Sequence, residues 1–315
     1  MSDDRKPPSS ASPDAPPRSG SDAELAGRGP EQDASISFVG AVPPGHFYSP
    51  IPSIDEVRRD EERLFANVPR SLPGIDFREE AQICLLQTFA DRYYAEMPFG
   101  AHPSSAHRFY FENPMFSYAD ALCLYCMIRH FAPKRVIEVG SGFSSAATLD
   151  TNDLFFEGRI QTTFIEPHAD RLMSLLRDSD KERSTILRSR LQDVEVGLFA
   201  SLEENDILFI DSTHVSKIGS DVNRIFFEVL PALAAGVIVH FHDIFLPAEY
   251  PTRWIYDGCA WNEAYLMHAF LQFNNRYEIL LMNHFIARFH EAFISDRMPL
   301  FMKNSGGSFW IRRVS

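Results

Sequence analysis

The sequence predicts an α/β fold built on a doubly wound, mostly parallel sheet of seven strands, preceded by an N-terminal helical extension. Short apolar runs, such as ILFI at residues 207–210, alternate with helical patterns over the second half of the chain. Near-continuous apolar runs indicate strands covered on both faces, as in parallel sheets with right-handed crossovers. With 315 residues, of which 45% are hydrophobic, the chain is long enough to form one large core.

Three regions are expected along the chain. Residues 1–35 are rich in Pro, Ser, Asp, Gly and Ala and have almost nothing to bury, which predicts a disordered tail. Residues 36–116 are expected to form a helical and irregular extension that covers the site. Residues 117–315 are expected to form the sheet domain.

Three helices are predicted before the first strand. Ser53 can cap a short helix that runs to about Phe65. Residues 76–96 have apolar side chains with a 3.6-residue period, which is typical of an amphipathic helix. The third helix covers residues 117–131, with Ser117 and Asp120 expected to form its N-terminal cap and Pro133 expected to end it.

The seven predicted strands come after these helices. They lie at about residues 135–139, 160–165, 185–189, 206–210, 237–241, 277–282 and 308–313. Helices are expected between the first five strands, and a further helix is expected at 261–273. The last two strands form a hairpin-like pair that closes the sheet, and Gly306-Gly307 precedes the final one.

The turn after the first strand is the most informative feature, and it reads VIEVGSGFSS from residue 136 to residue 145. Gly140 and Gly142 have no Cβ and can adopt φ > 0, so a ligand can approach the main chain there. Ser144 and Ser145 are good caps for the helix that comes next. We therefore expect a nucleotide-like cofactor at this turn.

The acid in this segment narrows the choice of cofactor. A dinucleotide fingerprint has the form G-x-G-x-x-G, but Ser145 replaces the third glycine and Glu138 precedes the first. Carboxylates repel phosphates and attract cations. S-adenosylmethionine carries a sulfonium and an ammonium but no phosphate, so an acidic turn suits it better than a pyrophosphate.

This segment resembles the first motif of class I S-adenosylmethionine-dependent methyltransferases. From about Phe109 to the C-terminus, the chain resembles their metal-associated branch that methylates hydroxyls of small molecules and sugars. The resemblance implies a Rossmann-like methyltransferase fold and S-adenosyl-L-methionine as cofactor. The residues expected to bind that cofactor are Glu138, Gly140, Ser141, Gly142, Ser144, Glu166, Gln192, Asp193, Phe116 and Ser117.

The resemblance implies roles for several of these residues. Glu166 ends the second strand, where the family's acid accepts hydrogen bonds from both ribose hydroxyls. Gln192 and Asp193 come after the third strand, where relatives contact adenine. Phe116 and Ser117 lie just before the helix that precedes the sheet, where relatives close over the methionine end of the cofactor.

Acids and histidines gather at the ends of the fourth and fifth strands, and ligands bind at this edge of doubly wound sheets. The resemblance implies a divalent cation held by Asp211, Asp243 and His242. Carboxylates favour Mg²⁺, while an imidazole shifts the preference towards Mn²⁺, Fe²⁺ or Zn²⁺, so the identity of the metal stays open. His214 lies three residues after Asp211, and an ordinary pKa near 6.5 suits a general base. The predicted catalytic residues are therefore His214 and Asp211.

The predicted function is transfer of a methyl group from S-adenosylmethionine to a hydroxyl of a small molecule or sugar. Two alternatives stay open: a catalytically silent binding or scaffold protein with this fold, and a nicotinamide-dependent oxidoreductase. The aromatic segment 247–261 either lines the acceptor pocket or covers the helix beneath it.

Composition excludes several other classes. A formal net charge of −13 with no basic patch disfavours binding to nucleic acid or to an anionic membrane. The four cysteines lie in apolar sequence and are expected to be reduced and buried, with Cys123 and Cys126 on the core face of a helix. Neither a signal peptide nor an apolar run of membrane-spanning length is recognised, so the expected location is the cytoplasm. A homo-oligomer stays possible.

Overall fold

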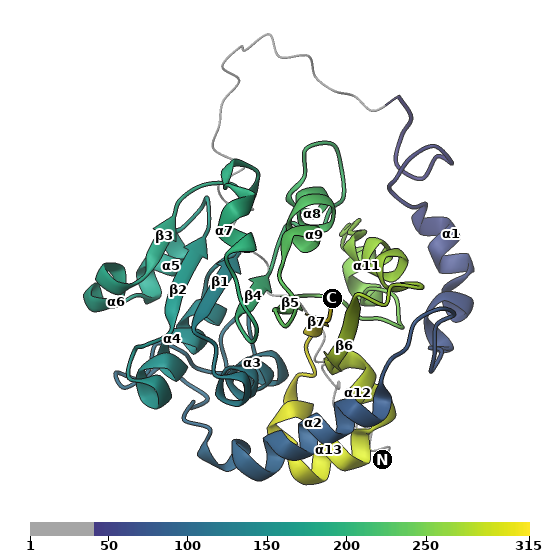
Figure 1. Cartoon of the computed structure of the whole chain (residues 1–315). Helices are drawn as coiled ribbons and strands as arrows, with labels where there is room; N and C mark the ends of the chain where they lie inside the picture. Colours follow the sequence, from purple (N-terminus) through teal and green to yellow (C-terminus); the bar gives the residue numbers. More distant parts are fainter. Residues whose placement is uncertain (1–40) are drawn as a thin grey trace, which may run out of the picture.

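The computed structural model describes residues 41–315 and shows a seven-stranded sheet with helices on both faces (Figure 1). The predicted tail, residues 1–35, lies outside the described residues. The strand order is β3-β2-β1-β4-β5-β7-β6. Strands β1 to β5 pair in parallel, and β7 is antiparallel to both β5 and β6. The predicted fold class is confirmed.

The strands begin and end close to their predicted positions. They are β1 Arg135–Val139, β2 Gln161–Ile165, β3 Thr185–Leu187, β4 Ile207–Ile210, β5 Ile238–Phe241, β6 Tyr277–Met282 and β7 Phe309–Arg313. Strands β1 and β6 have the predicted bounds, while β3 ends earlier than predicted.

Among the described residues, helices fill the connections between strands. The α-helices are α1 Ile54–Arg59, α2 Glu79–Arg92, α3 Tyr118–Phe131, α4 Phe143–Phe156, α5 Asp170–Leu175, α6 Asp178–Arg183, α7 Val196–Ala200, α8 Asp221–Arg224, α9 Leu230–Ala232, α10 Thr252–Tyr256, α11 Glu263–Leu271, α12 Asn283–Phe289 and α13 Glu291–Arg297. Short 3-10 or π-helical turns are η1 Glu62–Ala66, η2 Tyr94–Glu96, η3 Leu191–Asp193, η4 Ile225–Val229 and η5 Pro299–Lys303. Helices α3 and α4 lie on one side of the sheet, and α7, α8, α9 and α11 lie on the other (Figure 1).

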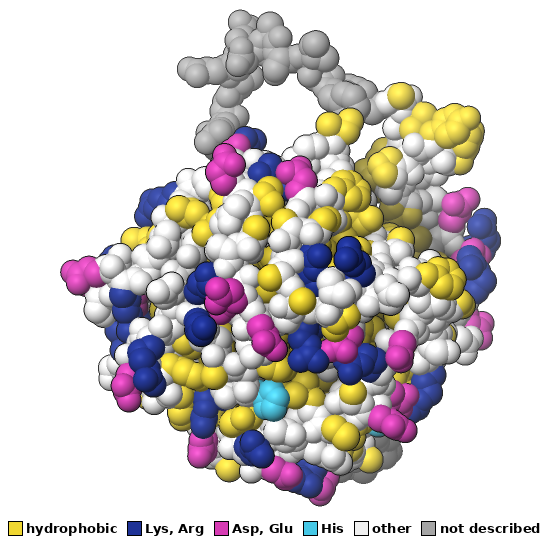
Figure 2. Space-filling view, in the orientation of Figure 1, with side chains coloured by type: hydrophobic (Ala, Val, Ile, Leu, Met, Phe, Trp, Pro, Cys, Tyr) yellow, Lys and Arg dark blue, Asp and Glu magenta, His cyan; other side chains and the backbone are white. Residues whose placement is uncertain are grey.

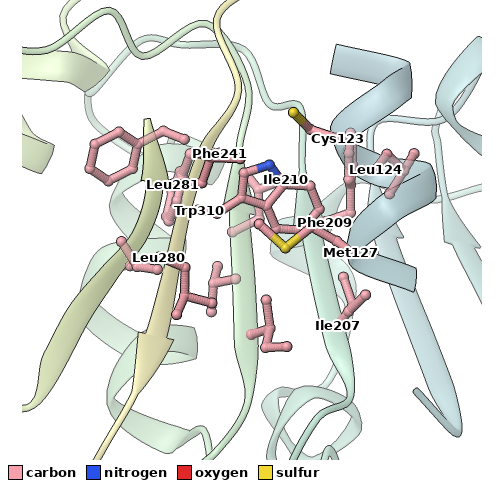
Figure 3. Close-up of a cluster of buried hydrophobic side chains, with 14 of the residues drawn as sticks. Cys123, Leu124, Met127, Ile207, Phe209, Ile210, Phe241, Leu280, Leu281 and Trp310 are labelled. Carbon is pink, nitrogen blue, oxygen red and sulfur yellow. The ribbon is translucent and has the colours of Figure 1, made fainter. Parts of the chain in front are cut away.

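The core between α3 and the sheet explains why the pre-sheet helix is firmly placed. Figure 3 shows Met127 of α3 facing Phe209 of β4 and Trp310 of β7, and all three side chains are buried. Burying a side chain of this size contributes roughly 1.5–3 kcal/mol relative to exposure. This packing holds α3 against β4 and β7.

The N-terminal extension shares this core. Ser53 caps α1 as predicted, since its side chain accepts a hydrogen bond from the Glu56 N–H. Helix α2 packs against β6, and its buried Gln82 donates to the Phe77 carbonyl and accepts from the Met282 N–H. In Figure 1, α2 lies beside α13. The domain boundary between residues 116 and 117 stays a prediction.

The predicted cap of α3 is wrong. Ser117 precedes the helix, but its hydroxyl donates to the Phe111 carbonyl and makes no capping bond. Asp120 is buried and accepts hydrogen bonds from Ser308, far along the chain. Tertiary partners, which the local pattern cannot show, have replaced the local cap. The helix ends before Pro133 as predicted, with Ala132 in the left-handed region.

Other expectations about surface and compartment can be compared with the described part of the chain. No helix within residues 41–315 is long and apolar enough to cross a membrane. Figure 2 shows basic and acidic side chains intermixed over the visible face. Cys123 and Cys126 are buried as predicted, but Cys84 is exposed on the outer side of α2 and Cys259 is half-buried. Cytoplasmic location and oligomeric state stay predictions.

Candidate functional site

The glycine turn after β1 requires glycine at one position. Gly140 has a φ of 77°, and a Cβ placed there would lie 1.8 Å from the Asp211 carbonyl oxygen. The turn is also held by backbone bonds, because Gly140 N–H donates to Ile165 O and Asp211 N–H donates to Val139 O. The start of α4 therefore lies directly beside the end of β4.

The second glycine does not have the predicted conformation. Gly142 has a φ of 179°, which is extended backbone, so the expectation of φ > 0 is wrong there. It is instead the N-cap of α4, and its N–H donates to the Ser145 hydroxyl at 3.0 Å. Ser145 thus takes part in capping as the third residue of the helix, whereas the Ser144 hydroxyl donates to Glu138 and its predicted capping role is wrong.

Glu138 lies beneath the turn rather than on its outer side. It is buried, and its Oε1 accepts hydrogen bonds from the hydroxyls of Ser144 at 2.5 Å and Ser145 at 2.9 Å. Burial raises the pKa of Glu138 to about 8, against the opposing effect of the two serines. At pH 7 this raised pKa favours the neutral carboxyl. The predicted repulsion of phosphate by Glu138 is correspondingly weakened.

Two polar atoms at the turn are left without partners. Within residues 41–315, Glu138 Oε2 and Ser141 Oγ are buried and form no hydrogen bond. Buried polar groups are ordinarily hydrogen-bonded, so these atoms fit a ligand with polar groups of its own. The turn therefore has the chemical character of the predicted cofactor site.

The structure brings only some of the other predicted cofactor residues to this turn. Glu166 accepts hydrogen bonds from the N–H groups of Ser141 at 3.2 Å and His168 at 2.7 Å. By contrast, Gln192 donates to the Gly219 carbonyl, and the exposed Asp193 forms an ion pair with Arg190. Glu166 therefore lies next to the glycine turn, whereas Asp193 is paired with Arg190 on the surface.

Phe116 approaches the other half of the site. Its buried ring contacts Phe209 at a centroid distance of 5.8 Å and His242 at 5.4 Å. Nearby, the ring of Tyr110 meets that of Phe143, the first residue of α4, at 5.6 Å. The segment before α3 thus runs from the glycine turn to the end of β5.

Three predicted residues converge at the ends of β4 and β5. His214 Nε2 lies 3.4 Å from Asp211 Oδ1 and 3.8 Å from Asp243 Oδ2. Asp211 keeps 38% of its side chain exposed, while Asp243 keeps 16% and His214 7%. We call Asp211, His214 and Asp243 the rim triad. Its most exposed member, Asp211, is half-buried at the sheet edge next to the glycine turn.

Glu263 is a site residue that the sequence interpretation missed. It is buried at the first position of α11, and its Oε2 lies 3.0 Å from His214 Nδ1. Its other oxygen accepts from the Ser212 hydroxyl at 3.2 Å. A carboxylate that holds Nδ1 fixes the ring orientation and leaves Nε2 directed at the two aspartates. The only local signal was an acid near the start of the predicted 261–273 helix.

Two members of the rim triad have left-handed backbones. The φ angle is 59° at His214 and 57° at Asp243. Such conformations cost roughly 1–3 kcal/mol for a non-glycine residue and persist only where neighbours enforce them. At His214, the carbonyl accepts hydrogen bonds from the N–H groups of Asn262 and Glu263. The start of α11 therefore holds both the backbone and the ring of His214.

Charge is unevenly shared within the triad. Burial opposes protonation of His214, but hydrogen bonds to Asp211 and Glu263 outweigh it and raise the pKa of His214 well above its ordinary value. Burial opposes ionisation of Asp211, but the charge of His242 and the bond from His214 lower its pKa. Burial raises the pKa of Asp243. These shifts favour an imidazolium at His214 next to an ionised Asp211.

The third predicted metal ligand lies behind the triad. His242 Nε2 is 3.7 Å from Asp243 Oδ1, and its Nδ1 is buried and has no partner among the described residues. Two carboxylates and an imidazole have the donor chemistry of a cation site. However, no group of three or more His, Cys, Asp or Glu side chains within residues 41–315 is arranged to hold a metal ion.

The aromatic segment 247–261 packs on the triad. The Trp261 ring lies 4.5 Å from that of His214, and Trp254 meets Trp261 at 5.1 Å. Both tryptophans are half-buried, and residues 252–256 form the short helix α10. A hollow of about 470 Å³ lined by Arg135 and Gln161 lies elsewhere, at the amino ends of β1 and β2, and is too remote to serve the triad.

Comparisons with known proteins agree with this geometry. Residues 137–244 match the profile of a family described as a methyltransferase domain, a span that includes the glycine turn and the whole rim triad. An uncharacterized protein of Archaeoglobus fulgidus is 36% identical over 193 residues, which cover 57% of this chain and 81% of that protein. Residues 137–244 therefore belong to this methyltransferase-domain family, within a chain that has the class I methyltransferase fold.

Solved methyltransferases with a similar chain were also found. One is the methyltransferase PaMTH1 of Podospora anserina bound to SAH, with 16% identity, coverage of 88% of this chain and 100% of that chain, and a TM-score of 0.41. Another is the O-methyltransferase TomG of Streptomyces achromogenes, involved in tomaymycin synthesis and solved with SAM. It has 13% identity, covers 76% of this chain and 92% of that chain, and has a TM-score of 0.39.

Proposed function

We propose that this methyltransferase transfers the methyl group of S-adenosylmethionine to a hydroxyl of a small molecule at the rim triad. The observation that carries the proposal is the buried Glu263–His214 pair, whose second ring nitrogen, Nε2, faces Asp211 beside the glycine turn. Methyl transfer to oxygen needs a positioned nucleophile and a group that removes its proton. An imidazole held at Nδ1, with Nε2 directed at the sheet edge, suits the second task.

The cofactor is proposed to lie along the glycine turn. Ser141 and Glu138 offer unpartnered polar atoms there, and Glu166 closes the same turn from β2. When bound, S-adenosylmethionine supplies the electrophilic methyl group and its own leaving group. Because Gly140 packs against the Asp211 carbonyl, the turn and the triad are adjacent.

His214 is proposed as the base, under one condition that its surroundings impose. An imidazolium cannot accept a proton, and the neighbouring carboxylates favour that form of His214 by raising its pKa. Any positive charge brought next to Asp211 and Asp243 weakens this effect and lowers the pKa of His214. His214 then accepts the hydroxyl proton at Nε2, while Glu263 stabilises the imidazolium that results.

A divalent cation is a further proposal for the same place. Asp211 and Asp243 would provide oxygen ligands and His242 a nitrogen, with Mg²⁺ the first choice and Mn²⁺, Fe²⁺ or Zn²⁺ as alternatives. Such an ion, when bound, would polarise the acceptor hydroxyl. The present arrangement of these side chains is incomplete as a metal site, because His214 Nε2 stands near both carboxylates.

The test combines binding and turnover. Calorimetric titration with S-adenosylhomocysteine, with and without Mg²⁺ or Mn²⁺, measures cofactor binding. Labelled S-adenosylmethionine and a panel of phenols, sugars and other hydroxyl compounds, analysed by mass spectrometry, measure transfer. We expect His214→Ala to bind S-adenosylhomocysteine as the native protein does and to lose transfer. The matched control, His102→Ala, removes an exposed histidine and should leave both unchanged.

Two results would contradict the proposal. One is the absence of any heat on titration with S-adenosylhomocysteine, which would contradict the proposed cofactor. The other is full transfer activity in His214→Ala, which would contradict the proposed role of His214 as base. The methyltransferase assignment would still stand in that case.

A further inference from the structure

A turn formed by residues 304–308, just before β7, lies between a buried acid and the rim triad. We infer that Asp120, acting through this turn, fixes the position of the Asp243 carboxylate, and that Asp120 is therefore a positioning residue of the site. The inference rests on the proposed function only in that it treats Asp243 as part of the reacting site.

The first contact joins α3 to the turn. Asp120 is buried, and its Oδ1 accepts hydrogen bonds from Ser308 N–H at 2.9 Å, Ser308 O–H at 2.6 Å and Asn283 Nδ2 at 3.3 Å. The Ala119 N–H donates to the Asn304 carbonyl at 3.0 Å. Both ends of the turn are thus bonded to the first turn of α3.

The glycines of the turn fit closely against the two acids. Gly306 has a φ of 62°, and a Cβ there would lie 2.1 Å from Asp120 Oδ2. A Cβ on Gly307 would lie 2.8 Å from the Asp243 Cα and 3.0 Å from its Oδ1. The Gly307 carbonyl accepts a hydrogen bond from the Ile244 N–H at 3.0 Å. The turn therefore touches Asp120 through one glycine and Asp243 through the next.

This arrangement supplies the support that Asp243 needs. A left-handed backbone at a non-glycine residue persists only where its surroundings enforce it. At Asp243, Gly307 packs directly against the backbone and Oδ1, and Gly307 is placed by the bonds from Ser308 to Asp120. A shift of the turn would move the Asp243 carboxylate relative to His214.

A purely structural role is the competing explanation. A satisfied buried carboxylate and a tight turn can stabilise the fold without affecting the reacting atoms. A perturbation of Gly307 distinguishes the two explanations, because a structural role predicts a change in stability alone. A positioning role predicts that Asp243 moves and that the rate of methyl transfer changes.

The test uses Gly307→Ala and Asp120→Asn, with Gly197→Ala as matched control because a Cβ at Gly197 meets nothing within 4 Å. We expect crystal structures of Gly307→Ala to show Asp243 displaced, and kcat for methyl transfer to fall by about 10- to 100-fold. The affinity for S-adenosylhomocysteine should equal that of the native protein, because the substitution does not alter the turn at Gly140 to Gly142. Asp120→Asn, which keeps the side-chain shape, should change kcat in the same direction.

A double variant gives the sharper measurement. If the turn acts through Asp243, Gly307→Ala should have no further effect on kcat in an Asp243→Asn background. An equal effect in both backgrounds, or a native position of Asp243 in Gly307→Ala, would overturn the inference. If no acceptor is methylated at all, the proposed function fails, yet the position of Asp243 in the variant structure still decides this inference.

Discussion

The buried ion cluster around Arg108 allows a quantitative prediction about stability. Arg108 lies in the segment before α3 and keeps only 2% of its side chain exposed. Its guanidinium pairs with Asp150 at 2.6 Å, Asp153 at 2.9 Å and Asp180 at 2.5 Å. The cluster joins this segment to α4 and α6, which lie beyond the glycine turn.

Replacing Arg108 by Ala leaves two fully buried aspartates with less compensation. Removing one partner of a buried ion pair typically costs about 3–5 kcal/mol, because the remaining charge stays buried and unpaired. We expect the free energy of unfolding to fall by about that amount at pH 7, measured by urea titration. Arg108→Lys keeps the charge but loses the forked geometry, so it should lie between the native protein and Arg108→Ala.

The pH dependence gives a second readout of the same cluster. Burial opposes ionisation of Asp180 and Asp153, but hydrogen bonds from arginines outweigh it and lower both pKa values below 3.8. An acid with a lowered pKa stabilises the folded state above its unfolded pKa and loses that contribution as the pH falls. The difference in the free energy of unfolding between the native protein and Arg108→Ala should therefore be largest near pH 7 and become smaller below about pH 4.

Arg190→Ala is the matched control, because Arg190 forms an exposed pair with Asp193. Its unfolding midpoint should hardly change. If Arg108→Ala were as stable as Arg190→Ala, the reasoning would be refuted, since desolvation would then cancel the whole attraction within the cluster.

Three further predictions concern the site itself. Gly140→Ala should abolish S-adenosylhomocysteine binding in calorimetry, because the added Cβ meets the Asp211 carbonyl at 1.8 Å, and native binding by this variant would contradict the assigned cofactor turn. Glu263→Gln should lower kcat by about 100-fold or more with little change in cofactor affinity, and an unchanged pH–rate profile would show that Glu263 does not orient His214. For Glu138, burial raises the pKa from 4.5 to about 8, so the folded protein binds the proton more tightly and loses stability as the pH rises through that range. In urea titrations, Glu138→Gln should therefore gain stability relative to the native protein as the pH rises from 5 to 8. A difference in the free energy of unfolding that does not change with pH would contradict the raised pKa of the buried Glu138 carboxyl.

Much of the fold was predictable because it depends on local patterns. An apolar run such as 207–210 is typical of a strand that is covered on both faces, as in a parallel sheet. This pattern involves only neighbouring residues, so the sequence shows it directly. Gly140 was identifiable for the same reason, since a strand followed by a glycine turn and a serine-capped helix is a local signal. Asp211, Asp243 and His214 were predicted from their positions at strand ends, which a parallel sheet brings to one edge.

The sequence by itself determined the order of strands and helices, the glycine turn and the set of polar residues at one sheet edge. Only the tertiary structure decided how those residues are used. Glu263 meets His214 across 49 positions of sequence, and Asp120 meets Ser308 across 188. Burial, which depends on the whole core, gives Glu138 its raised pKa and turns Asp120 from an expected helix cap into the anchor of a distant turn. Contacts between residues far apart in the sequence, and the burial of side chains away from solvent, arise only when the chain is packed. A local sequence pattern therefore cannot predict them.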